Sequence, residues 1–456
     1  MSIVDKSSNI RLFRRFLMTG TIVALTATGA LAQSPFSLKD CISYGLKNHP
    51  AVEVAGNNIE NARQASREAL AGYLPQVSLN GDLSNNLKLQ TNIIPANPPL
   101  FPQETRLTFG NKYTSVLTAQ VEQPIYNQSL ITGLKANKPN QEIANLTAEQ
   151  VKQNLIYNIS SSYFQVITIY KQLELLNSNK TRTERLLEVA KLQAEAGVAK
   201  KVDVKQVQVS LNNVLAQISV VQNNLQLSYN TLKNAMGIFG NDSIILTDTA
   251  RWLQAIPQIT SVPEFNAANT VDYKLQEKQI QLYDINARSI RARALPSISA
   301  FGRYGMNGFG AEMSDVFSRQ FDYSTIGLRF SWSVFDGFRR NAQYRQALYQ
   351  RDNAQLNLEV NTANQNLQYL NAVSQFRQAQ STLATNKDNV NLATEVYDNV
   401  TLQYKEGVGS LSDLLNAESS YRDAQNNYIL SLINYYLAQL DLERANSNLE
   451  QYYNKL

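Results

Sequence analysis

The polar and apolar residues of this chain alternate with two different periods, and the change of period predicts where strands give way to helices. Alternation at every second residue, which is typical of a β-strand with one apolar face, occurs in four stretches. These stretches begin near Val77, Tyr113, Ile298 and Ile326. Each is about 9–11 residues long, which is enough to cross an outer membrane, although the same alternation also suits a soluble sheet.

Loops are expected between the paired strands. A long exposed loop is predicted in the first pair, where four prolines cluster at Pro95, Pro98, Pro99 and Pro102. The shorter loop of the second pair is expected to hold Gly305, Gly308 and Gly310. Four strands cannot close a membrane barrel, because the smallest barrels have about eight, so membrane-spanning strands would require two or three chains to associate.

Long helical segments follow the strands. They run from about 127 to 196 and from about 337 to 406, and some 70 residues of helix reach roughly 100 Å. Pro139 is expected to kink the first of them, because proline removes a backbone donor. Each segment then meets a glycine turn, at Gly197 or Gly407, after which a second helix returns.

The returning helices carry apolar residues at strict intervals of seven. In the first helix these are Val204, Leu211, Ile218, Leu225 and Leu232. In the second they are Leu414, Tyr421, Tyr428, Tyr435 and Leu442. The two sets are offset by 210 residues, as are the two glycines. A heptad stripe marks a packed seam between helices, so both returning helices are predicted to pack in the same register.

Two further segments complete the pattern. Ser37 to Tyr73 is predicted to be helical, with Ser37 as the cap and a break near Pro50. The segment 238–270 contains Trp252 and mixed polarity, and we expect it to be compact and partly irregular beside the helical bundle.

The chain also repeats itself. Leu74-Pro75 returns as Leu295-Pro296, Gln123-Pro124 returns as Trp332-Ser333, and Gly197 returns as Gly407, in the same order. Pro124 to Gly197 is 73 residues and Ser333 to Gly407 is 74, whereas Pro75 to Pro124 is 49 and Pro296 to Ser333 is only 37. We therefore expect an internal duplication, with rigid elements of constant length and surface loops of variable length.

The first 32 residues have the pattern of a secretory signal. Arg11, Arg14 and Arg15 form a positive region, Phe16 to Ala27 is apolar, and Ala30-Leu31-Ala32 is a small-residue cleavage site. The apolar stretch is too short for a membrane anchor, which needs about 20 residues. We expect Gln33 to begin the exported protein.

The composition of the chain excludes several classes of function. The net charge of +5 becomes +2 without residues 1–32, since 38 basic and 36 acidic residues remain, and this balance disfavours nucleic-acid binding. Cys41 and His49 are the only residues of their types, which excludes an intrachain disulfide and a histidine cluster within the chain. The sequence offers no phosphate loop, metal cluster or nucleophile–base pair, so we expect no cofactor, no metal and no enzyme.

Together these motifs resemble the TolC-like outer-membrane efflux proteins. The resemblance rests on the motifs Leu74-Pro75, Leu295-Pro296, Gln123-Pro124-Ile125-Tyr126 and Val334-Phe335-Asp336-Gly337, and on the turns at Gly197 and Gly407. Each motif alone is common, but their order and spacing recur in both halves.

The resemblance implies a mainly helical, internally duplicated chain whose four β-strands contribute to a trimeric, twelve-stranded β-barrel in the outer membrane of a Gram-negative bacterium. It implies a helical tunnel of about 100 Å in the periplasm. The implied division of the chain is a signal peptide at 1–32, first-copy periplasmic helices at 33–74 and 127–237, a first barrel hairpin at 75–126, an equatorial segment at 238–270, second-copy helices at 271–295 and 337–448, a second barrel hairpin at 296–336, and a C-terminal tail at 449–456.

The same resemblance implies a periplasmic gate near the two glycine turns. Its aspartates would be Asp203 and Asp413, and its tyrosine would be Tyr404. An arginine is expected where this chain has Gly409, and a further aspartate where it has Asn416, so Lys200 and Lys201 are candidates for the missing cation. In a trimer, Asp413 would form a ring of three carboxylates that favours cations. The alternative is that Asp203 and Asp413 only stabilise helix starts.

The implied function is that of a passive conduit in a tripartite efflux pump or a type I secretion system. The partners would be two further copies of the chain, a periplasmic adaptor, an inner-membrane transporter of the RND or ABC class, and outer-membrane lipid. The docking surface would consist of Gly197, Val198, Gly407, Val408, Gly409, Ser410, Leu411 and Ser412. The alternative is a soluble periplasmic coiled-coil scaffold or adaptor, and the sequence leaves the cargo open.

Overall fold

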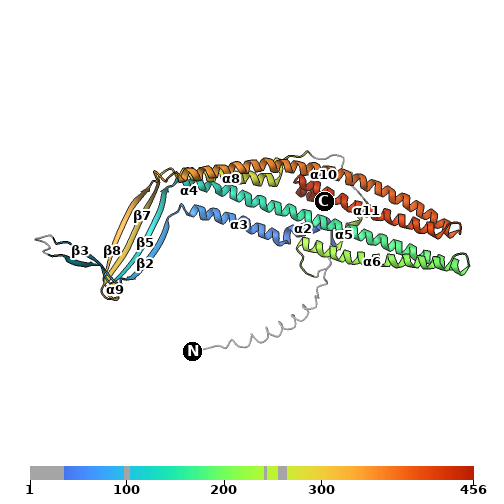
Figure 1. Cartoon of the computed structure of the whole chain (residues 1–456), viewed down its shortest axis with the longest axis horizontal. Coiled ribbons are helices and arrows are strands. Elements are labelled where there is room, and N and C mark those ends of the chain that lie inside the picture. Colours follow the sequence, from blue (N-terminus) through green and yellow to red (C-terminus); the bar gives the residue numbers. More distant parts are fainter. Residues whose placement is uncertain (1–34, 97–102, 241–243, 255–263) are drawn as a thin grey trace, which may run out of the picture.

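The structure is a computed structural model, and it describes residues 35–96, 103–240, 244–254 and 264–456. The expected signal peptide at 1–32 lies outside the described residues. The molecule is long and narrow, with a β-sheet towards one end and a bundle of antiparallel helices towards the other (Figure 1). In the part of the chain that the structure describes, no helix combines the length and the apolar character needed to cross a membrane.

Each half of the chain contains a helix, two long strands, a long helix and a returning helix, in that order. The first half contains α2 (Leu38–Asn48), α3 (Pro50–Ala71), β2 (Gln76–Asn85), β5 (Tyr113–Tyr126), α4 (Gln128–Gly133), α5 (Asn137–Glu195) and α6 (Lys201–Met236). The second half contains α8 (Val271–Ala292), β7 (Ser297–Gly310), β8 (Gln320–Ser331), α10 (Arg339–Lys405) and α11 (Leu411–Ala445). The two predicted strand pairs and the two predicted long helices are therefore present.

The four long strands form one antiparallel sheet in the order β2-β5-β7-β8. Its register places Val77, Val121, Gly302 and Ile326 in one row across all four strands. On this face the apolar side chains are exposed, as in the case of Ile326 at 88% and Val77 at 75%. Strands β2 and β8 form the two edges, and neither pairs with another described strand on its outer side.

Two loop predictions are wrong. The proline-rich segment contains a second hairpin, β3 (Gln90–Ile94) paired with β4 (Thr105–Phe109), although residues 97–102 lie outside the described part. The glycines at 305, 308 and 310 belong to β7 and not to a loop. They are needed there because neighbouring groups cross close over the strand: a Cβ at Gly305 would lie 2.5 Å from the Tyr323 ring.

The helix boundaries follow the caps that the sequence supplies. The Ser37 hydroxyl accepts from the Asp40 backbone N–H, and the Asp40 carboxylate accepts from the Ser37 N–H, which forms a capping box. The helix is interrupted at His49, which lies between α2 and α3, and Pro50 begins α3. A short 3-10 turn at 134–136 separates α4 from α5, because Pro139 cannot donate a backbone hydrogen bond to this turn.

The main core lies midway along the long helices, where Leu246 and Trp252 of the segment between the two halves pack against them. Strand β1 (Pro35–Phe36) pairs in parallel with β6 (Ile245–Leu246), and α7 (Thr249–Gln254) follows. The Trp252 ring packs edge-on against Phe164 at 5.1 Å, and Phe164 stacks on Tyr436 at 4.3 Å. The predicted tail forms α12 (Leu449–Lys455), whose Leu449 is buried in the same core.

Candidate functional site: the two helical turns

The turns that join α5 to α6 and α10 to α11 have the same backbone conformation. Gly197 and Gly407 both have a φ angle of +76°, a region that strongly favours glycine. The N–H of Val198 donates to the Gln193 carbonyl at 2.8 Å, and that of Val408 donates to the Gln403 carbonyl at 3.0 Å. Both helices therefore end in the same glycine-dependent motif, which satisfies carbonyls that would otherwise lack partners.

The outer surface of the turns is apolar at its tips. Val198 is 71% exposed and Val408 is 81% exposed, whereas Leu411 is only 7% exposed. Leu411 packs in a cluster with Leu414 and other buried residues of both hairpins. The prediction that Leu411 belongs to the docking surface is therefore wrong. Leu411 is the first residue of α11, and it lies on the same buried face of this helix as Leu414.

The two aspartates occupy equivalent positions in the first turn of their helices. The Lys200 N–H donates to the Asp203 carboxylate at 3.1 Å. The Ser410 hydroxyl donates to the Asp413 carboxylate at 2.7 Å and accepts from the Asp413 N–H at 3.1 Å. Both carboxylates thus stabilise a helix start, where the partial positive charge of the helix favours an anion.

Tyr404 lies inside the tip and close to Asp203. Its ring is 5% exposed, and its hydroxyl finds no hydrogen-bond partner among the described residues. Burial raises the pKa of Tyr404, and the negative charge of Asp203 raises it further. The Gln193 side chain donates to the Tyr404 carbonyl at 3.2 Å, so it links the two hairpins.

The remaining expected gate and docking residues lie on the surface. The side chains of Lys200, Lys201, Ser412 and Asn416 are exposed, as is Ser410 at the start of α11. Gly409 is tightly enclosed: a Cβ there would lie 3.0 Å from the Tyr404 nitrogen and 3.1 Å from Gln403.

A buried polar seam further along the hairpins was not predicted. Glu418 on α11 is 4% exposed and accepts from the Thr183 hydroxyl at 3.2 Å and the Ser210 hydroxyl at 3.5 Å. Its other carboxylate oxygen has no partner among the described residues. One layer along, Asn179 bonds to Gln425. The seam therefore joins α5, α6 and α11 through polar groups.

A sequence signal for this seam was available. A second set of α11 residues also falls at intervals of seven, and three of its five members are polar. The set is Leu411, Glu418, Gln425, Leu432 and Gln439, and all five are buried. Polar residues at such positions commonly fix register in packed helices. Arg182 lies beside the seam, 5.0 Å from the Tyr421 ring centroid and 5.9 Å from that of Tyr397.

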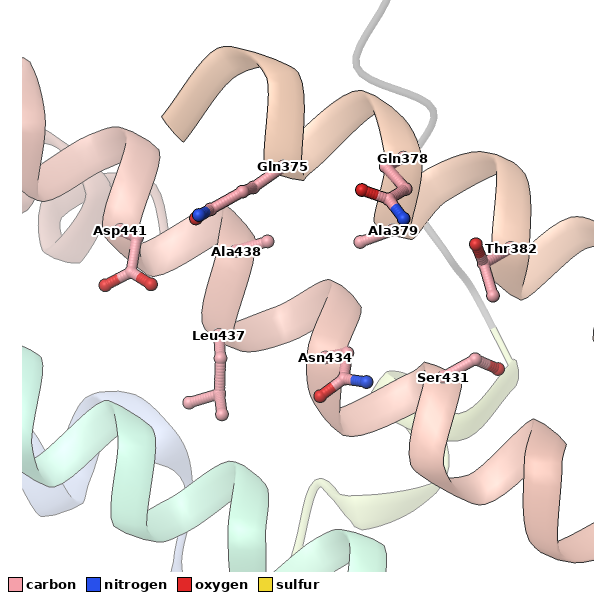
Figure 2. A pocket seen from close by; sticks show the side chains of 9 residues that line it. All are labelled: Gln375, Gln378, Ala379, Thr382, Ser431, Asn434, Leu437, Ala438 and Asp441. Atoms are coloured by element: carbon pink, nitrogen blue, oxygen red, sulfur yellow. The ribbon is translucent and has the colours of Figure 1, made fainter. Parts of the chain in front are cut away.

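A groove of about 390 Å³ opens between α10 and α11, and Figure 2 shows the side chains that line it. Most are amides, hydroxyls or small apolar groups, such as Gln375, Thr382 and Asn434. The one acid, Asp441, accepts a hydrogen bond from the Tyr157 hydroxyl at 2.8 Å. Among the described residues, no group of three His, Cys, Asp or Glu side chains is placed to hold a metal ion. The groove offers no nucleophile–base pair.

Comparison with known proteins identifies the family of this chain. The family model described as outer membrane efflux protein matches residues 42–238 and 267–447. The chain belongs to the outer membrane efflux protein family. The resemblance to TolC-like proteins is thus confirmed, and the protein is an outer-membrane protein of a transport family.

Named relatives are distant but span most of the chain. Outer membrane protein TolC of Vibrio cholerae is 22% identical over 431 residues, which cover 93% of this chain and 94% of the relative. TolC of Escherichia coli K12 is 21% identical over 439 residues, covering 94% and 85%. The solvent efflux pump outer membrane protein SrpC of Pseudomonas putida is 22% identical over 313 residues, covering 67% and 63%.

Solved structures of this family share the fold. CusC matches with a TM-score of 0.72 and 16% identity, covering 90% of this chain and 91% of its own. The open state of the MtrE channel of Neisseria gonorrhoeae matches with a TM-score of 0.71 and 15% identity, covering 90% and 89%. The mainly helical architecture with a small sheet is therefore that of outer-membrane channels.

Proposed function

We propose that three copies of this chain form a channel that carries efflux cargo passively across the outer membrane. The observation that carries this proposal is the four-stranded sheet, which has an exposed apolar face and two edges, β2 and β8, that are unpaired on their outer sides among the described strands. An exposed apolar sheet with open edges is a liability in water, but both features suit a closed barrel in lipid. Three chains supply twelve strands, and the family resemblance favours three over two.

In this arrangement the long helices form a tunnel in the periplasm. Helices α5 (59 residues) and α10 (67 residues) each extend roughly 90–100 Å, and α6 and α11 return beside them. The energy for transport comes from an inner-membrane transporter of the RND or ABC class, which a periplasmic adaptor connects to the tunnel. Residues 1–32 direct export of the chain. Lipid contacts the apolar face of the barrel.

Localisation and assembly test this proposal. The protein should fractionate with outer membranes, require detergent for extraction and have the mass of three chains in detergent. Planar bilayers that contain it should show single-channel conductance. Extraction by carbonate alone, as a monomer, would instead indicate a soluble periplasmic scaffold or adaptor.

The gate is proposed to lie at the two helical turns, where Asp413 forms a ring of three carboxylates in the trimer. A ring of acids in a narrow pore attracts cations. Asp413→Asn should reduce cation selectivity in single-channel recordings. Asp203→Asn, at the equivalent position of α6, tests the other proposed gate aspartate in the same recordings. Unchanged selectivity in Asp413→Asn would leave this residue with its helix-capping role alone.

The adaptor is proposed to dock on the exposed turns. Val198 and Val408 carry the apolar surface there, with Lys200, Lys201 and Ser412 close by. Val408→Asp should abolish efflux in cells that lack other such channels, while the trimer still assembles. Val209→Asp, at an exposed valine on the side of α6, is the matched control. Normal efflux by the Val408→Asp protein would contradict this docking assignment.

A further inference from the structure

The polar face of the sheet carries an arrangement of aromatic and cationic side chains that the gate does not use. Phe301 on β7 lies over Gly327 of β8, where a Cβ would approach the ring to 2.9 Å. Four residues further along β7, and so two rows away on the same face, Tyr323 of β8 lies over Gly305 in the same way, and its hydroxyl is 2.8 Å from that of Thr118. The absence of a Cβ at each glycine thus leaves room for the ring against the neighbouring strand.

Arg303 occupies the row between these two rings. The register pairs it with Gln120 on one side and Thr325 on the other. Its guanidinium carbon lies 5.2 Å from the Phe301 ring centroid, within the range of a cation–π interaction. Arg329 approaches the same ring at 5.4 Å. Phe301 therefore lies near two guanidinium groups.

The two arginines differ in how their charge is balanced. Arg329 forms an ion pair of 3.2 Å with Glu122, whose carboxylate also accepts from Gln120 and Ser299. Arg303 forms no ion pair within the described part of the chain, and its Nε atom has no hydrogen-bond partner there. This layer of the sheet therefore carries one unbalanced positive charge per chain.

The nearest other charge on this face is Asp82 of β2. The register pairs Asp82 with Val116, four residues along β5 from Gln120, which is roughly 13 Å. That distance exceeds the screening length of about 10 Å at 0.1 M salt, so Asp82 does not cancel the Arg303 layer.

We propose that Arg303 and Phe301 form a second selectivity ring inside the barrel, which binds anionic cargo that has an aromatic or apolar face. This inference rests on the proposed trimeric channel, in which the polar face of the sheet lines the lumen. Three Arg303 side chains then supply a ring of positive charge, and three Phe301 rings supply flat apolar surfaces beside it. The sign is opposite to that of the proposed Asp413 ring at the periplasmic end.

The probe that matches this chemistry is naphthalene-1,3,6-trisulfonate, an aromatic trianion, applied to single channels in about 0.1 M salt. The wild-type channel should be blocked at lower concentration by this probe than by citrate, an aliphatic trianion. Arg303→Gln should raise the concentration for half-block at least about threefold and shift the reversal potential towards cations. Arg303→Lys should keep the reversal potential but weaken the aromatic block.

The matched control is Arg106→Gln, which removes the same charge from β4, outside the four-stranded sheet. It should leave both readouts unchanged. Equal block by the two trianions in wild type, or an unaltered half-block in Arg303→Gln, overturns the ring while the channel stands. If the Arg303→Gln trimer does not assemble, the wild-type comparison of the two trianions and the Arg303→Lys variant decide. A wild-type protein without conductance overturns the channel and the ring together.

Discussion

The Asn179 side-chain amide on α5 donates to the Gln425 side-chain oxygen on α11 at 3.0 Å, and both residues are buried. The two residues are 246 positions apart and belong to different hairpins. Because each buried amide would lose this partner if the two hairpins shifted relative to each other, the pair couples the position of the second hairpin to that of the first.

A double-mutant cycle tests this coupling. Asn179→Leu and Gln425→Leu should each lower the free energy of unfolding by about 2 kcal/mol, because each leaves a buried amide unpaired. The double variant should lose less than the sum of the two, with a coupling of at least about 1 kcal/mol. Denaturant unfolding in detergent measures these values. Asn230→Leu at an exposed site on α6 is the control, and strict additivity would show that the bond is not made.

The positive φ angles at the two turns predict the effect of alanine. Gly197→Ala and Gly407→Ala should each destabilise the protein by about 1 kcal/mol, since a Cβ is disfavoured in this conformation. Gly56→Ala, in the exposed middle of α3 with nothing near its Cβ, should stabilise by up to about 1 kcal/mol. The same sign for Gly56 and the turn glycines would contradict the assigned turn conformation.

Removing the Tyr404 hydroxyl should not weaken the isolated tip. The hydroxyl is buried and finds no partner among the described residues, so Tyr404→Phe should leave the unfolding midpoint unchanged or raise it. The ring, which packs in the cluster of both hairpins, is kept. Tyr404→Ala is the contrasting variant and should lose about 3–4 kcal/mol. A clear loss in Tyr404→Phe would show that the hydroxyl bonds to another subunit in the assembled protein.

Glu443, near the end of α11, is expected to make the stability of the protein depend on pH. Burial raises the pKa of Glu443, and Lys455 of α12 opposes this shift. The raised pKa means that the neutral form is favoured in the folded protein, so the stability contributed by this group is present in acid and is lost as pH rises through the folded pKa.

Glu443→Gln should therefore raise the thermal midpoint at pH 7, and the difference from wild type should shrink below the ordinary glutamate value of 4.5. Thermal melts between pH 4 and pH 8 measure the difference. Glu450→Gln, at an exposed position in α12, is the matched substitution of the same type. A gain that persists unchanged at pH 4 would point to packing and not to charge.

Local patterns predicted the elements that depend on near neighbours. Alternation located β2 and β5, heptads located the buried faces of α6 and α11, and the two turn glycines have the predicted role. Proline and glycine were less informative. Prolines suggested a loop where a hairpin, β3 with β4, occupies the ends of the segment, and glycines suggested a loop where β7 continues. In both cases the segment is a strand because it pairs with another strand, and the local sequence does not indicate that partner.

Only part of the candidate site could be predicted from the sequence, for the same reason. Positions such as Asp203, Tyr404 and Asp413 came from the family resemblance, and their side chains are indeed at the turns. The inward direction of Leu411 and the polar seam at Glu418 depend on how two hairpins pack. One heptad stripe identified a packed face, but it did not show that the second stripe would bury acids and amides.

The sequence by itself determined the order and the periods of the four long strands and of the long helices, the turns at Gly197 and Gly407, and the family. Those features follow from backbone preferences and from spacing along one chain. Only the tertiary structure decided which polar groups are buried together, such as Asn179 with Gln425, and which side chains of the turns remain exposed. It also placed Arg303 between two aromatic rings on one face of the sheet. These relationships depend on contacts between segments that are distant in sequence, for which no local period exists.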